Sequence, residues 1–206
     1  MSPPFVILLN YKGGEIVYFP ENMTFQYFFF DTYPGCFLQV LPVALLAGLV
    51  YGVVRFKRDR AAPLAQKIWS VVFVCYLTGL IALTVVPQNL WGNIWYWIFY
   101  GRPSGARIWL FTFDYNFIPD FLSNFDGENL MNILLLTPFA ILHPLACKNA
   151  SWNKTVRTGV LTTVTIELVQ PVFGRAFDIN DIILNVLGVL VVASVFFLFS
   201  SAIKRR

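Results

Sequence analysis

Residues 182–203 read IILNVLGVLVVASVFFLFSSAI, a run without a single ionisable side chain. A helix needs roughly 20 mostly apolar residues to cross the hydrocarbon layer of a bilayer. Of the 206 residues, 57% are apolar, 17% aromatic and 13% charged, and the mean hydropathy is +0.65. Soluble domains carry about 25% charged residues. The sequence therefore predicts an integral membrane protein, and the same values exclude disordered and coiled-coil classes.

Four further segments have the length and composition of membrane spans. The predicted spans are residues 35–54, 68–86, 129–147, 155–173 and 182–203. The fourth is the most polar, because it contains Glu167 and Gln170. The predicted fold is thus an all-α bundle of about five transmembrane helices, with residues 1–34 as an external N-terminal segment and 35–206 as the transmembrane domain.

The basic residues predict how the bundle is oriented, since short cytoplasmic loops hold most Lys and Arg. If the spans alternate, one side collects 11 of the 15 basic residues but, of the 11 acidic residues, only Asp59. We therefore predict a multi-pass protein of the cell membrane with its N-terminus outside and its C-terminus in the cytoplasm. The net charge of +4 is not gathered on one polar face, so the bilayer is the expected partner and nucleic acid is not.

The two long outer segments carry different signals. Two β-rich runs flank Lys12 near the N-terminus, which indicates either a hairpin or an irregular tail on the lipid head groups. In the second segment, Trp91, Ile94, Trp95 and Ile98 recur at helical spacing, which predicts an interfacial aromatic helix. Tryptophan and tyrosine favour the head-group zone, so this helix is expected to anchor the protein.

Polar side chains are costly inside a membrane, so each of them suggests a functional hypothesis. Here they gather at one depth, near the outer ends of the last three spans and in the loop between the fourth and fifth. They are Asn132, Glu167, Gln170, Arg175, Asp178, Asp181 and Asn185, with Gly188 on the same helical face. The sequence predicts one outward-facing polar pocket, in which Arg175 pairs with a carboxylate.

Structural roles compete with this interpretation. Asp181 has the place of a helix N-cap for the fifth span, and Asn132 and Asn185 could be interhelical hydrogen-bonding residues. Asp178 could simply pair with Arg175. A packing role accounts least well for Glu167, because a carboxylate inside a span needs a partner or a proton.

The sequence gives little support for a histidine-based catalytic site or for a metal site. His143 is the only histidine and lies roughly 16 Å deeper than Asn132 by helical rise, which excludes a histidine-based triad. Cys36, Cys75 and Cys147 lack metal-ligand spacing and are interpreted as packing residues. We expect no metal and no cofactor.

Four motifs add a resemblance: NFIP at residues 116–119, NILLLTPFAIL at 132–142, IELVQ at 166–170 and RAFDINDIILNVLG at 175–188. In this order and spacing they resemble the VanZ-like family of membrane proteins over roughly residues 116–190. Leu136 and Ala140 depart from the family pattern, which favours Phe and Gly there. The resemblance adds Asn116 to the candidate pocket and matches the other positions named above.

The resemblance implies a Gram-positive envelope protein that contributes to resistance against teicoplanin-type glycopeptides. The pocket would then engage a lipid-linked wall precursor or the glycopeptide itself, in resistance or envelope homeostasis. Two alternatives stay open. One is a membrane enzyme that modifies a lipid or wall precursor, with Glu167 as general acid or base and Asp178 and Asp181 holding a divalent cation. The other is a transporter, which the shallow cluster and the lack of a visible repeat disfavour.

Overall fold

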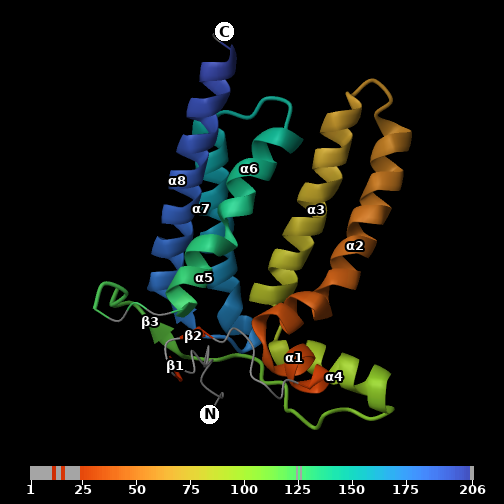
Figure 1. The fold of residues 1–206 in the computed structure, drawn as a ribbon, viewed down its shortest axis with the longest axis vertical. Coiled ribbons are helices and arrows are strands. Elements are labelled where there is room, and N and C mark those ends of the chain that lie inside the picture. The colour runs from red at the N-terminus through yellow and green to blue at the C-terminus, as the bar shows by residue number, and fades with distance from the viewer. Residues whose placement is uncertain (1–10, 13–14, 17–23, 124, 126, 205–206) are drawn as a thin grey trace.

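The computed structural model describes residues 11–12, 15–16, 24–123, 125 and 127–204. Long helices run side by side as a bundle, and short helices and strands gather at one of its ends (Figure 1). The helices are α1 (Phe25–Asp31), α2 (Tyr33–Arg58), α3 (Leu64–Thr84), α4 (Gln88–Tyr100), α5 (Gly127–Leu135), α6 (Thr137–Ala146), α7 (Trp152–Val169), the 3₁₀ turn η1 (Gln170–Phe173) and α8 (Ile179–Lys204). The strands are β1 (Tyr11–Lys12), β2 (Glu15–Ile16), β3 (Tyr115–Asn116) and β4 (Phe177–Asp178).

The predicted all-α membrane fold is confirmed. Within the described residues, four segments are long and apolar enough to cross a membrane, namely Tyr33–Arg58, Leu64–Thr84, Asn129–Ala146 and Ile179–Ser201. The fourth predicted span, residues 155–173, forms α7 and the η1 turn; α7 lies beside α8 in the bundle (Figure 1) but is more polar than the other four spans. A membrane crossing by α7 therefore stays a prediction.

The third predicted span is not one continuous helix, because the chain breaks between α5 and α6 at Leu136. Pro138 lacks the N–H that would bond to the carbonyl of Leu134, and its ring would clash with that carbonyl. The hydroxyl of Thr137 donates to the Leu134 carbonyl instead (2.8 Å), and the Tyr76 hydroxyl donates to that of Leu135 (2.9 Å). Side chains thus satisfy the carbonyls that the break frees, as a membrane interior requires.

The fourth and fifth predicted spans also have different ends. α7 stops at Val169, and the chain continues as η1 because Pro171 cannot extend the α-helical hydrogen bonding. α8 begins at Ile179, so Asp178 and not Asp181 occupies the capping position. The Asp178 carboxylate accepts from the backbone N–H of Asn180 at 2.8 Å. The predicted capping role of Asp181 is therefore wrong, because β4 holds Phe177–Asp178 extended and the helix starts directly after it.

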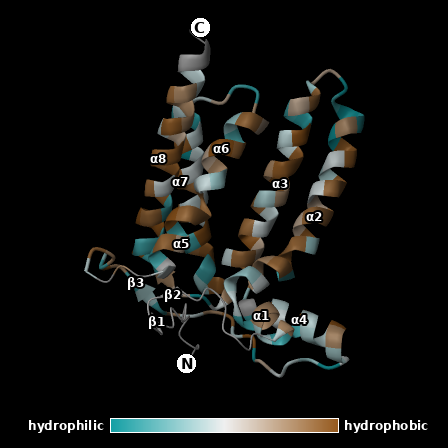
Figure 2. Cartoon of the chain, in the orientation of Figure 1, coloured by the Kyte–Doolittle hydropathy of each residue, from teal (hydrophilic) through white to brown (hydrophobic). Residues whose placement is uncertain are grey.

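The core lies between α3, α6, α7 and α8, where Leu136, Ala140, Ile166 and Val189 are buried. The outer faces of the long helices carry exposed apolar side chains, and apolar residues cover most of α8 (Figure 2). The chain thus presents apolar surface to lipid as well as to its own core, which is the pattern of a membrane bundle.

The three cysteines do not all pack in the core. A Cβ added at Gly48 would lie 2.0 Å from the sulfur of Cys75, so α2 and α3 approach closely there. Cys36 is half-buried, whereas Cys147 is exposed after the end of α6. The predicted packing role is therefore wrong for Cys147.

The predicted aromatic helix is α4, which lies across one end of the bundle (Figure 1). The indole N–H groups of Trp91 and Trp95 donate to the carbonyls of Ala82 and Gln39, each at 2.8 Å. These tryptophans therefore fasten α4 to the bundle. α1, which the sequence did not predict, packs Phe29 edge-on against Trp95 at a ring-centroid distance of 5.5 Å.

At the N-terminus, β1 and β2 pair antiparallel with Tyr11 opposite Ile16, as the hairpin interpretation expects. The rest of residues 1–23 lies outside the described part of the chain.

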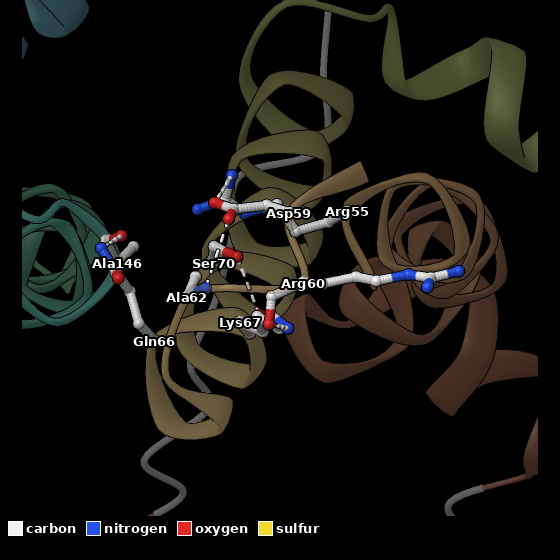
Figure 3. A network of polar contacts seen from close by, with 8 residues as sticks. All are labelled: Arg55, Asp59, Arg60, Ala62, Gln66, Lys67, Ser70 and Ala146. Carbon is white, nitrogen blue, oxygen red and sulfur yellow. Dashed lines mark hydrogen bonds and ion pairs between the residues drawn. The ribbon is translucent and has the colours of Figure 1, made fainter. Parts of the chain in front are cut away.

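The end of the bundle away from α1 and α4 holds the α2–α3 loop, the α6–α7 loop and the C-terminal end of α8 (Figure 1). We call it the basic end. Here Arg55 pairs with Asp59 at 2.9 Å, and Lys67 donates to the Arg60 carbonyl at 3.3 Å (Figure 3). Gln66 reaches across to the carbonyl of Ala146 at 3.4 Å, which links α3 to α6.

Candidate functional site

A cavity of about 140 Å³ lies at the end of the bundle opposite the basic end, and we call this the cavity end. Its wall is built by α2, α3 and α4 together with α5, α7, η1 and α8. Six of the predicted site residues line it: Asn132, Glu167, Gln170, Arg175, Asp181 and Asn185. Asn116, Asp178 and Gly188 lie outside its lining. The fold therefore brings most of the predicted polar residues together in the wall of one cavity.

Glu167 is the most deeply buried carboxylate of the cavity wall, with 2% of its surface exposed. It sits in the last turn of α7, where Thr163 and Gln170 share its helical face. The described hydrogen bond of its carboxylate is a long one, from the backbone N–H of Asp178 at 3.4 Å. A buried carboxylate normally has shorter and more numerous donors, so Glu167 retains acceptor capacity toward the cavity.

Gln170 and Arg175 hold the end of α3. The last four carbonyls of a helix have no partner within it, and in α3 these belong to residues 81–84. The Gln170 amide donates to the Thr84 carbonyl at 3.1 Å, and the Arg175 guanidinium donates to the Leu83 carbonyl at 3.2 Å. The positive charge of Arg175 also suits the negative end of the helix dipole. Both residues thus have a structural role in addition to lining the cavity.

Arg175 does not form the ion pair that the sequence suggested. Among the described residues, the ion pair within 4.0 Å is Arg55–Asp59 at the basic end. Asp178 instead accepts from the Asn116 side chain at 3.2 Å and caps α8. Asn116 and Asp178 are brought together by the parallel pairing of β3 with β4. The guanidinium of Arg175 therefore lines the cavity, and no carboxylate of the described residues is in salt-bridge contact with it.

Asp181 and Gly188 join α8 to α5. The Asn132 amide donates to the Asp181 carboxylate at 2.5 Å. About two turns further along the same face of α8, a Cβ on Gly188 would lie 2.2 Å from the Ile133 carbonyl oxygen. The predicted close backbone approach at Gly188 is therefore present, and it sets the spacing of the two helices that carry Asn132 and Asp181.

Two buried polar groups of the cavity wall have no partner within the described part of the chain: the hydroxyl of Thr163 and the side-chain oxygen of Asn185. The two residues are 1% and 4% exposed. Thr162 and Thr165 on the same helix donate to the carbonyls four residues back, at 2.8 and 2.7 Å. Thr163 does not, although that local bond is available to any helical threonine.

Sequence reasoning missed Thr163 and Asn180. Thr163 could have been found, because it precedes Glu167 by four residues and Gln170 by seven on one helical face. Asn180 is 5% exposed, and its amide oxygen accepts from the Asp120 N–H at 3.1 Å while its NH₂ donates to the Asp120 carboxylate at 2.7 Å. Asn180 thereby fixes the loop that follows β3.

His143 lies in the last turn of α6, toward the basic end, and it is not among the residues that line the cavity. Its Nδ1 is 2.9 Å from the Thr155 hydroxyl, and its Nε2 is 3.5 Å from that of Thr158. Both ring nitrogens thus have partners, as the packing interpretation predicted. Among the described residues, no three His, Cys, Asp or Glu side chains gather as metal ligands.

The comparison with protein families agrees with this architecture. No curated protein and no solved structure matches the chain. The family model VanZ/LLP1 matches residues 44–200, which extends well beyond the motifs between residues 116 and 190 and includes α3 and most of α2. The chain belongs to the VanZ/LLP1 family of membrane proteins.

Proposed function

We propose that the cavity binds the compact head group of a lipid-borne molecule of the Gram-positive cell envelope. By doing so, the protein lowers the effect of teicoplanin-type glycopeptides. One observation carries the proposal: Thr163 and Asn185 are buried, line the cavity and have no described partner. An unpartnered buried polar group costs about 1–3 kcal/mol, so a ligand that satisfies such groups gains affinity there.

The size of the cavity excludes a whole glycopeptide, and it equally excludes the complete sugar–peptide head group of a wall precursor. A volume of about 140 Å³ is close to that of an engineered cavity of roughly 150 Å³ that accepts benzene. A glycopeptide is a macrocycle with attached sugars and is far larger than this. A compact lipid head group fits, and its chains would leave through the apolar wall beside Phe37 and Leu135.

The proposed orientation places the cavity at the outer membrane surface, because the basic residues mark the opposite end as cytoplasmic. A reporter fused after Arg206 should then be cytoplasmic, and one inserted near Asp126 should be external. An external C-terminal reporter would place the cavity on the cytoplasmic side and remove its access to lipids of the outer leaflet.

The substitution Glu167→Gln tests the function. We expect it to abolish resistance to teicoplanin while the protein stays in the membrane at near-normal abundance, because glutamine keeps the volume and can still hydrogen-bond. The measurement is drug susceptibility in a Gram-positive host, normalised to membrane abundance. Full resistance per molecule in this variant would remove the best residue from the proposal.

Asp178→Asn is the matched control. It makes the same change from carboxylate to amide eleven residues away, outside the cavity lining. Asparagine caps helices about as well as aspartate, and it can still accept from the Asn180 N–H that Asp178 binds at 2.8 Å. Resistance should therefore survive, and its loss would mean that any lost charge at this end of the bundle is harmful.

A further inference from the structure

The charged groups of the cavity wall indicate what kind of head group it takes. Glu167 and Asp181 supply two carboxylates and Arg175 supplies one guanidinium. We propose that the occupant is zwitterionic and carries a primary ammonium together with a phosphate, as the head group of an aminophospholipid does. This inference rests on the proposed function, since it names the ligand class of the same cavity.

The acceptors of the wall come from two neighbouring helices, α7 and α8. Thr163 and Glu167 are four residues apart on α7, and Asp181 and Asn185 are four residues apart on α8, so each pair shares a helical face. α7 and α8 lie side by side (Figure 1), and all four residues line the cavity.

These acceptors suit a primary ammonium group, which has three N–H donors and no acceptor. The Asn185 side-chain oxygen has no described donor, and the described donor to Glu167 is the long one at 3.4 Å. Three short N–H donors would supply what these groups lack. A quaternary ammonium carries the same charge but cannot donate a hydrogen bond.

Arg175 provides the positive charge of the wall. One nitrogen of its guanidinium, Nη1, is held by the Leu83 carbonyl at the end of α3 at 3.2 Å, which fixes the position of the group. A guanidinium has five N–H donors in a planar fork that matches the oxygens of a phosphate. The side chain is half-buried, so a phosphate would meet it partly shielded from water, where charge pairing is stronger than in bulk solvent.

The test uses the purified full chain in detergent. It is titrated by calorimetry with dihexanoyl-phosphatidylethanolamine, dihexanoyl-phosphatidylcholine and dihexanoyl-phosphatidylglycerol, each below its micelle-forming concentration. We expect the ethanolamine lipid to bind at least tenfold more tightly than the other two. Equal binding of the glycerol lipid would overturn the need for an ammonium, and equal binding of the choline lipid would overturn the need for N–H donors.

Two variants connect this preference to the wall. Glu167→Gln and Asn185→Leu should each weaken binding of the ethanolamine lipid at least tenfold and leave binding of the glycerol lipid unchanged. Asp178→Asn, outside the cavity, should keep the full preference. If Asp178→Asn lost it as well, or neither cavity variant did, the assignment to this wall would be wrong.

Soluble phosphoethanolamine separates a lipid from a free metabolite. Binding at least tenfold weaker than that of the ethanolamine lipid supports a membrane source, and equal binding overturns it. The outcome is also separable from the proposed function. If Glu167→Gln abolishes resistance but the ethanolamine and glycerol lipids bind equally, the cavity keeps its role and the zwitterionic ligand is rejected.

Discussion

The two ends of the bundle treat buried polar groups differently. Near the basic end, His143 is buried and both of its ring nitrogens lie beside threonine hydroxyls. Arg55 leaves its Nε without a described partner, but its guanidinium pairs with Asp59 at 2.9 Å. At the cavity end, Thr163 and Asn185 are buried and their oxygens bond to nothing described. A buried polar group with a protein partner is explained by the fold, whereas a buried polar group without one calls for another partner, which we propose is the ligand.

The largest effect should come from the helix contact that shapes the cavity end. Gly188→Ala places a Cβ 2.2 Å from the backbone oxygen of Ile133, so α5 and α8 must separate. Overpacking of this kind costs about 1–3 kcal/mol, and a clash with backbone belongs at the upper end. We expect a lower thermal midpoint and reduced membrane abundance.

Gly92→Ala is its control, because nothing lies within 4 Å of a Cβ at this position of α4. Alanine replaces glycine in a helix with a gain of up to about 1 kcal/mol. The thermal midpoint should stay the same or rise. An equal loss of stability in the two variants would show that the α5–α8 contact is not special.

A smaller effect is expected near the basic end. His143→Leu removes the partner of the buried Thr155 hydroxyl, which lies 2.9 Å from Nδ1, and should cost about 1–2 kcal/mol. Resistance per molecule should not change, because His143 is outside the cavity lining. The measurements are thermal unfolding in detergent and drug susceptibility normalised to abundance.

The double variant His143→Leu with Thr155→Val should recover most of this loss, since replacing both partners of a buried hydrogen bond by apolar groups is nearly neutral. If His143→Leu lowered resistance at unchanged abundance, the histidine would have a functional role, and its interpretation as a purely structural residue would be wrong.

Much of the fold could be predicted from local pattern. Apolar runs of sufficient length located α2, α3 and α8, and the recurrence of Trp91, Ile94, Trp95 and Ile98 located α4. The break at Leu136 was missed although Pro138 signals it, because the apolar composition continues unchanged across it.

The sequence predicted which residues belong to the site better than it predicted their hydrogen-bond partners. Their shared depth in the membrane, and the free-energy cost of burying polar side chains there, identified Glu167, Asp181 and Asn185 as neighbours. The bond from Arg175 to the end of α3 was not predictable, because it joins residues 92 positions apart and depends on how η1 packs. The choice of Asp178 over Asp181 as the helix cap depended on the pairing of β3 with β4, which the local sequence does not reveal.

The substitution Asn185→Leu tests the central claim most directly, namely that the buried polar groups of the cavity without a described partner serve a ligand and not the fold. Leucine has a similar size and removes a buried side chain with an unpartnered oxygen, so the free energy of unfolding should rise by about 1 kcal/mol. Thermal unfolding in detergent and drug susceptibility per molecule are measured on the same variant. We predict a higher thermal midpoint together with loss of resistance, whereas a lower midpoint, or full resistance in a stabilised protein, would contradict the account.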